Sequence, residues 1–277
     1  MVPTRSSGRP LVMGVVNVTP DSFSDGGQWF EPEAAIAHGH ELLAAGADLL
    51  DVGGESTRPG AQRPSPEEEL RRVLPVVREL AGAGATVSVD TMRAEVAARA
   101  VEAGATVIND VSGGLADPAM AGVAADSGLP FIAMHWRGHS HDMQQRAVYA
   151  DVTAEVCAEL GRRVSALLEA GVERDNLVLD PGFGFAKTAA HNWSLLRHLE
   201  QVVALGYPVL VGTSRKTFLG RLGQPEGGDP RPPLERDAAT AATSLYAALA
   251  GVWAVRVHHV PSTLEALRVA EAIGEAP

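Results

Sequence analysis

Cysteine is nearly absent from this sequence, because Cys157 is the only one in 277 residues. An intrachain disulfide is therefore excluded. Cys157 lies between Val156 and Leu160 in an amphipathic helical pattern. That position favours an inert helix residue over a reactive thiol.

Long uncharged apolar stretches are also missing, although 45% of the residues are hydrophobic. No segment is long and uncharged enough to span a bilayer. Residues 1–9 contain Arg5 and Arg9 but lack the apolar core of a signal peptide. We therefore expect residues 1–9 to form a flexible N-terminal tail, and the protein to be cytoplasmic with no membrane partner.

Net positive charge is the third deficit. The chain has 34 acidic residues against 23 lysine and arginine residues, which gives a formal net charge of −11. This balance argues against nucleic acid or an anionic membrane as the partner. An anionic small molecule would still bind if the chain brings several cations together locally.

Short apolar runs alternate with helical patterns from Pro10 to about Ile273, without a linker or a shift in composition. This alternation predicts an α/β fold in which parallel strands close into a single (β/α)8 TIM barrel over residues 10–277. The expected strands are 10–17, 49–53, 86–90, 107–111, 131–135, 177–180, 208–213 and 253–258.

Asp90, Asn109 and Asp180 each stand at the end of a predicted strand. The carboxyl ends of barrel strands meet at one mouth, so these side chains should be neighbours. Two carboxylates and an amide suit a planar heterocycle with several N–H donors. The alternative is that each residue caps the helix that follows it.

Cations form a second set at the ends of later strands, where barrels often bind phosphate. The set is Arg58, Arg215, Lys216, Arg256 and His258. Arg256 and His258 alternate with valines, so both can face the interior. The alternative for Arg256 is a structural salt bridge with a carboxylate of the mouth.

Three other segments bear on the site. Loops over residues 19–30 and 55–63 follow strands, where lids and substrate contacts are expected. Residues 223–233 are rich in glycine and proline and predict a mobile surface loop without chemistry. His135, His139 and His141 resemble a metal cluster, but their loose spacing without cysteine disfavours zinc.

Seven segments in order closely resemble the dihydropteroate synthase family. They are NVTPDSFSDGG (17–27), DVGGESTRPGA (51–61), SVDT (88–91), NDVSGG (109–114), DPGFGFAK (180–187), GTSRKTFLG (212–220) and RVH (256–258). The resemblance implies a transferase of folate biosynthesis on a (β/α)8 barrel. Such an enzyme condenses 6-hydroxymethyl-7,8-dihydropterin diphosphate with p-aminobenzoate and releases 7,8-dihydropteroate and pyrophosphate.

The resemblance also implies a role for each matching residue. The catalytic residues would be Asp90, Lys216, Arg256 and His258. The pterin ring would contact Asp90, Asn109, Met134, Asp180, Phe185 and Lys216. The diphosphate would contact Asn17, Arg256 and His258. The p-aminobenzoate pocket would be formed by Thr57, Arg58, Pro59, Phe185, Ser214 and Lys216, and the loop lid would contain Phe23 and Asp25.

Further implications concern cofactor and partners. Asn17 would also bind Mg²⁺, sulfonamide inhibitors would occupy the p-aminobenzoate pocket, and the family commonly forms homodimers through helices far from the mouth. His259 departs from the acidic or amide residue that is usual after RVH in the family. This difference puts no central residue in doubt.

Two other functions remain open on the sequence. A methyltetrahydrofolate:corrinoid methyltransferase would share the acidic pterin-recognition pattern, but it has no diphosphate to bind, which the SRK and RVH cations argue against. A barrel that binds pterins or a partner protein without catalysis is the second alternative. Pyrophosphate release that depends on both substrates would separate all three.

Overall fold

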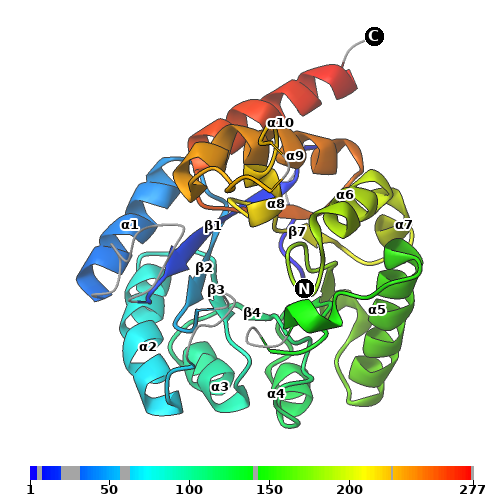
Figure 1. The fold of residues 1–277 in the computed structure, drawn as a ribbon. Helices are drawn as coiled ribbons and strands as arrows, with labels where there is room; N and C mark the ends of the chain where they lie inside the picture. Colours follow the sequence, from blue (N-terminus) through cyan, green and yellow to red (C-terminus); the bar gives the residue numbers. More distant parts are fainter. Residues whose placement is uncertain (5–7, 20–31, 57–62, 140–142, 226, 276–277) are drawn as a thin grey trace.

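The computed structural model describes residues 1–4, 8–19, 32–56, 63–139, 143–225 and 227–275. Eight parallel strands surround a central axis and helices cover their outside (Figure 1). The strands are β1 (Leu11–Asn17), β2 (Leu49–Gly53), β3 (Val87–Asp90), β4 (Val107–Asp110), β5 (Phe131–Met134), β6 (Leu177–Asp180), β7 (Leu210–Val211) and β8 (Ala254–Val257).

The sheet closes on itself. Its strand order is β6-β5-β4-β3-β2-β1-β8-β7, and a parallel bridge between Leu179 and Val209 joins the two ends. Each strand lies within the range expected from its apolar run. The prediction of a single-domain (β/α)8 barrel is therefore confirmed.

The helices follow the strands along the chain. In the described ranges they are α1 (Pro32–Ala44), α2 (Pro66–Gly82), α3 (Ala94–Glu102), α4 (Met120–Ser127), α5 (Val152–Glu169), α6 (Ala189–Arg197), α7 (Leu199–Val203), α8 (Thr217–Gly220), α9 (Asp237–Leu249) and α10 (Val260–Glu275). Short 3-10 helices are η1 (Met143–Arg146), η2 (Arg174–Asn176) and η3 (Pro233–Arg236). Local sequence sets the starts: Ser65 Oγ accepts a hydrogen bond from Glu68 N at 3.2 Å, and Asp151 Oδ1 accepts one from Thr153 N at 3.0 Å.

Inside the barrel, apolar side chains fill the amino-terminal end. One buried cluster there includes Leu49, Val107, Ile132, Val178 and Ala254. Residues two apart on a strand share a face. The same inner face therefore continues toward the carboxyl end as Asp51, Asn109, Met134, Asp180 and Arg256. The barrel interior is therefore apolar at its amino-terminal end and mainly polar at its carboxyl-terminal end.

The first residues of the chain lie against the barrel. Val2 belongs to the inner apolar cluster, and Trp253 Nε1 donates to Pro3 O at 2.7 Å. Arg9 Nη1 donates to Asp48 Oδ2 at 2.8 Å. Flexibility of residues 1–9 stays a prediction, and these contacts argue against it for Val2, Pro3 and Arg9. None of the helices in the described ranges is long and apolar enough to cross a membrane.

Candidate active site

A cavity of about 750 Å³ lies at the carboxyl ends of the strands. The structure brings together there ten residues that the sequence assigned to a site. They are Asn17, Asp90, Asn109, Met134, Asp180, Phe185, Ser214, Lys216, Arg256 and His258. The prediction that scattered polar strand ends become neighbours at one mouth is therefore confirmed.

The other five predicted site residues lie outside the described residues. They are Phe23, Asp25, Thr57, Arg58 and Pro59. Thr19 and Ser56, which directly flank those two segments, line the cavity. The roles of the five stay predictions.

Two carboxylates share one guanidinium at the floor of the cavity. Asp51 Oδ2 accepts from Asn109 Nδ2 at 3.0 Å and from Arg256 Nε at 2.6 Å. Arg256 Nη2 donates to Asp90 Oδ2 at 3.0 Å. The salt bridge that was the structural alternative for Arg256 is thus present. Arg256 also lines the cavity, so the salt bridge is compatible with the ligand-binding role, which stays a prediction.

The floor holds more negative charge than Arg256 neutralises. Burial, followed by the neighbouring Asp51 carboxylate, raises the pKa of Asp90 well above its ordinary value, while Arg256 opposes the shift. Asp51 is fully buried, and its Oδ1 has no hydrogen-bond partner among the described residues. Asp90 lines the cavity, so a ligand with N–H donors would relieve the cost at Asp90. Asp51 lies behind the cavity wall.

Asp180 and Lys216 form a second charged pair beside the floor. Burial raises the pKa of Asp180 and lowers that of Lys216 to about 8, and each charge opposes the shift of the other. Asp180 Oδ1 also accepts from Gly182 N at 2.7 Å, within the turn after β6. Asp180 does not cap the helix that follows, because the N-cap of α6 is Thr188.

Lys216 is held by the segment after β6. Its Nζ donates to Phe183 O and lies 4.5 Å from the centroid of the Phe185 ring, a cation–π contact. Met134 and Phe185 belong to one apolar cluster with Met92 and Val111. The cavity therefore has an apolar wall next to its charged floor, as a flat aromatic ligand requires.

Ser214 and His258 are coupled. Ser214 Oγ accepts from His258 N at 3.1 Å and lies 2.9 Å from His258 Nδ1. Oγ can also donate its own proton to Nδ1 or accept one from it, depending on the tautomer of His258. Arg215 has a different partner: Nε and Nη2 donate to the two oxygens of Asp237 at 2.7 and 2.8 Å.

Sequence reasoning missed two buried charges at this site. Asp51 is in the middle of β2, whereas the carboxylates and the amide predicted for the site stand at strand ends. Its place two residues after inward-facing Leu49 would have revealed it. Lys187 ends the DPGFGFAK segment, is 4% exposed and lines the cavity. An isolated lysine in a loop gives no sequence signal of burial.

The expectation of a surface loop without chemistry at 223–233 stays a prediction, although its last residue lies at the cavity. Pro233 begins η3 and lines the cavity. Nearby, Arg231 N donates to Gly220 O at 2.9 Å, which ties this segment to α8. Part of the segment therefore borders the site.

The fold and site together define a barrel enzyme that acts in its carboxyl-end mouth. The chain belongs to the pterin binding enzyme family, whose model matches residues 13–258. It is 53% identical over 259 residues to dihydropteroate synthase of Mycobacterium leprae (strain TN), an alignment that covers 93% of this chain and 91% of the relative.

Solved structures agree with this assignment. Dihydropteroate synthase of Xanthomonas albilineans with 4-aminobenzoic acid superposes with a TM-score of 0.88 at 47% identity, covering 97% of this chain and 94% of that one. The same enzyme in complex with 7,8-dihydropteroate gives 0.84 at 44%, covering 97% and 95%. Yersinia pestis dihydropteroate synthase with a sulfonamide drug complex gives 0.92 at 40%, covering 100% and 99%.

Proposed function

We propose that the chain is a transferase that joins the amino nitrogen of p-aminobenzoate to the methylene carbon of 6-hydroxymethyl-7,8-dihydropterin diphosphate. The products are 7,8-dihydropteroate and pyrophosphate. The observation that carries the proposal is one cavity with Asp90, Asn109 and Asp180 beside Lys216 and Arg256. It suits a ligand that is a nitrogen heterocycle at one end and a polyanion at the other.

The pterin ring would bind at the floor. Asp90, Asn109 and Asp180 offer oxygens to its N–H groups, and each charge-assisted bond contributes roughly 1.5–3 kcal/mol. Met134 and Phe185 would contact its faces. The raised pKa of Asp90 supports this role, because it marks a carboxylate that a donor-rich ligand would stabilise.

The diphosphate would bind next to the cations. The bonds of Arg256 to Asp51 and Asp90 use Nε and Nη2, and a guanidinium has five N–H donors. The remaining donors can face phosphate, together with His258 and Lys216. The positive charge of Arg256 and Lys216 would stabilise the pyrophosphate as it leaves, and His258 would add a hydrogen-bond donor, which lowers the barrier to C–O cleavage.

Mg²⁺ is the cofactor that we infer, with Asn17 as its protein ligand. Asn17 ends β1 and lines the cavity that Arg256 and His258 also line. One amide oxygen fits Mg²⁺, because this ion takes few protein ligands and completes its shell with waters and substrate phosphates. When bound, Mg²⁺ would neutralise charge on the leaving pyrophosphate.

The second substrate would enter beside Ser214, Phe185 and Lys216, with Thr57, Arg58 and Pro59 completing its pocket. The nitrogen of p-aminobenzoate is nucleophilic when neutral, so no dedicated strong base is required. The C–O bond of the pterin methylene would break first, which releases pyrophosphate and leaves cationic character on the methylene carbon. The aniline nitrogen would then attack this carbon, and it would lose one proton once the C–N bond has formed. Sulfonamides, which resemble p-aminobenzoate, would compete for this pocket. The loop residues Phe23 and Asp25 would cover the site and exclude water.

A homodimer is also part of the proposal. Large apolar side chains are exposed on α9 and α10, which pack side by side (Figure 1): Tyr246, Leu249, Val269 and Ile273. Such a surface on neighbouring helices suits a protein interface away from the cavity. Light scattering after size-exclusion chromatography should give twice the mass of one chain. The Leu249→Glu variant should give a mass closer to that of one chain.

Pyrophosphate release, measured with and without p-aminobenzoate, tests the function. Release should require both substrates and should be lost in Arg256→Lys, because lysine cannot form the paired bonds of a guanidinium. Arg268→Lys is the matched control, since Arg268 is a surface residue of α10 paired with Glu265. Methyl transfer from methyltetrahydrofolate to a corrinoid, or pterin binding without any pyrophosphate release, would instead support one of the other functions.

A further inference from the structure

Lysine is used at only two positions in this chain, Lys187 and Lys216, among 23 lysine and arginine residues. All other fixed cations are arginines. Arginine and lysine replace each other readily on exposed surfaces, whereas a compact ammonium with three donors fits tight polar sites that a planar guanidinium does not. Lys216 is in the proposed machinery. Lys187 is not, although it is buried in the same wall.

The ammonium of Lys187 has an acceptor for each of its three protons. Nζ lies 3.0 Å from Gly182 O, 3.2 Å from Phe185 O and 3.1 Å from His135 Nδ1. A buried ammonium is costly unless its donors are satisfied. The two carbonyls stand on either side of the turn that contains Phe183 and Gly184. Lys187 therefore holds both ends of this turn through its ammonium group, and we call these three bonds the clamp.

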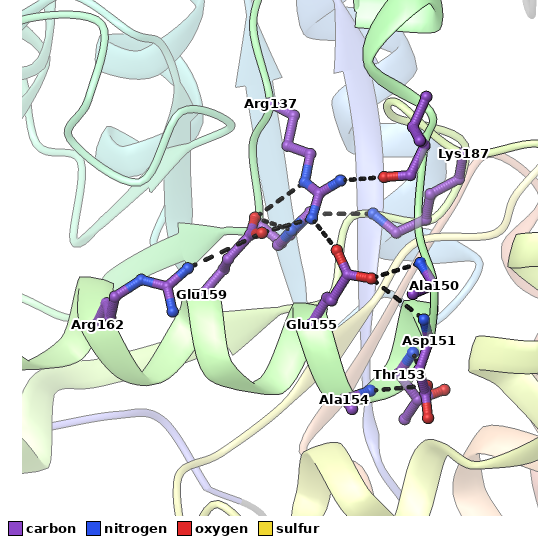
Figure 2. Close-up of polar contacts among 11 residues, drawn as sticks. Arg137, Ala150, Asp151, Thr153, Ala154, Glu155, Glu159, Arg162 and Lys187 are labelled. Atoms are coloured by element: carbon purple, nitrogen blue, oxygen red, sulfur yellow. Dashed lines mark hydrogen bonds and ion pairs between the residues drawn. The ribbon is translucent and has the colours of Figure 1, made fainter.

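His135 connects the clamp to helix α5. Its Nδ1 accepts from Lys187, so the ring proton is on Nε2, which lies 2.8 Å from Glu159 Oε2. Burial, followed by the charge of Lys187, lowers the pKa of His135 to about 4, which keeps the ring neutral. Figure 2 shows Glu159 and Glu155 of α5 converging on Arg137, with Lys187 nearby. Arg137 Nη2 donates to Glu159 Oε1 and, at 2.8 Å, to Glu155 Oε2.

The clamped turn has a backbone that needs support. Gly182, Gly184 and Ala186 have φ angles of 69°, 78° and 47°. Ala186 is strained there because a Cβ disfavours this region, and such strain persists only where surrounding contacts hold it. A Cβ at position 182 would lie 2.6 Å from His135 O, so the turn fits closely over the end of β5.

The same turn positions two residues of the site. Lys216 Nζ donates to Phe183 O and contacts the Phe185 ring, and a Cβ at position 184 would lie 2.7 Å from Lys216 Cδ. A shift of the turn therefore moves Lys216 and Phe185 together. A misplacement of about 1 Å at a distance from the reacting atoms can cost roughly 100-fold in rate.

We propose that Lys187 is a positioning residue for the reaction: with His135 and Glu159 it fixes the turn over residues 182–185, and the turn fixes Phe185 and Lys216 against the pterin. The inference rests on the proposed function. Burial lowers the pKa of Lys187 to about 7, and it faces Asp180, Lys216, Arg137 and Glu159 as well as neutral His135. Loss of its proton above neutral pH would remove one donor from the clamp.

The test is Lys187→Met in the full chain, which keeps the stem of the side chain and removes its three donors. Asn192 Oδ1 still accepts from Gly184 N at 2.7 Å, so the turn keeps one anchor and the fold should persist. We expect kcat/KM for the pterin diphosphate to fall roughly 100-fold. Arg162→Met on α5 is the matched control, because its guanidinium is exposed and lies 3.9 Å from Glu159 Oε1. It should have wild-type kinetics.

A second readout needs no turnover. Side-chain nitrogen labelling of lysine gives two NMR signals in the wild type and one, from Lys216, in Lys187→Met. The Lys216 signal should shift in the variant and respond less to added pterin. An unchanged Lys216 signal, or unchanged kinetics, would overturn the proposal. The NMR readout tests the inference without turnover. Pyrophosphate release by the wild type tests the proposed function separately, so the two failures can be told apart.

If Lys187→Met does not fold, Glu159→Gln replaces it. Glutamine keeps an acceptor for His135 Nε2 and removes the charge at the outer end of the network. We expect a several-fold fall in kcat/KM and a shift of both lysine signals. A Glu159→Gln variant with wild-type kinetics and both signals unmoved would likewise reject the clamp.

Discussion

Arg256 Nε lies 2.6 Å from Asp51 Oδ2, so a cation near the end of β8 is tied to a carboxylate in the middle of β2, across the intervening strand β1. Asp51 also accepts from Asn109 of β4. Three strands are thereby joined through one buried oxygen. This oxygen orients both the amide proposed for the pterin and the guanidinium proposed for the diphosphate.

Asp51→Asn should therefore impair activity, although Asp51 does not line the cavity and would not contact substrate. The amide keeps the shape of Asp51 but loses a charge-assisted bond worth roughly 1.5–3 kcal/mol, so kcat/KM should fall about 10- to 100-fold. Asp48→Asn is the control, because Asp48 also pairs with an arginine, Arg9, away from the cavity. Steady-state pyrophosphate release measures both. Equal kinetics in the two variants would contradict the orienting role.

Arg256→Ala should destabilise the fold in a pH-dependent way. The variant leaves Asp51 and Asp90 without their shared cation, which we expect to cost about 3 kcal/mol at neutral pH. Burial and Asp51 already raise the pKa of Asp90, and the variant removes the guanidinium that opposes this rise. The folded state therefore binds a proton that the unfolded state releases, and stability recovers as the pH falls toward 5. Urea unfolding at pH 7.5 and 5.5 measures this. An equal loss at both pH values would point to lost packing.

The sequence predicted the barrel well because each strand is a short apolar run with a polar end, and parallel topology then dictates where the ends meet. Asn109, Asp180 and Arg256 could be placed at the mouth on that ground alone. Their partners could not. The bonds from Asp51 to Asn109 and Arg256 join residues 58 and 205 positions apart, and only the closed sheet brings them together.

Lys187 shows a different limit. Its motif could be recognised, but its burial depends on a turn with three positive φ angles and on a histidine that faces the helices, not the mouth. Arg215 shows the converse, since it stands in a motif of cations yet binds Asp237 of α9. A motif indicates which residues lie near a site. The direction of each side chain depends on packing that local sequence does not encode.

Asp90→Asn should raise stability and lower affinity for the pterin diphosphate. Burial and Asp51 raise the pKa of Asp90, so wild-type stability falls as the pH rises from about 4 through the raised value, where the carboxylate must ionise inside the fold. An amide has no such cost. Unfolding free energies at pH 5 and 9 should diverge between the two proteins, with the variant more stable at pH 9. Calorimetric titration of the pterin diphosphate should show the weaker binding, and a less stable variant at pH 9 would refute the argument.

Lys216→Met should remove activity and change the alkaline stability profile. Burial lowers the pKa of Lys216 from 10.5 to about 8, so the unfolded state binds more protons between those values. Wild-type stability should therefore rise with pH from about 8 to 10.5, and the variant should lack that rise. Thermal melts across this range, compared at each pH, measure the difference. Parallel profiles would mean that the ammonium is well solvated in the folded protein.

Asn17→Ala tests the proposed Mg²⁺ ligand through binding, without turnover. In the wild type, Mg²⁺ should strengthen binding of the pterin diphosphate, because Asn17 would hold the ion and its charge would offset that of the phosphates. In the variant the affinity in EDTA should equal that of the wild type in EDTA, while added Mg²⁺ should help less. Calorimetric titrations of both proteins with and without the ion give the four affinities required. If Mg²⁺ strengthens binding equally in both, Asn17 is not its ligand, because only a residue that contacts the ion can lose the ion-dependent part of the affinity and keep the rest.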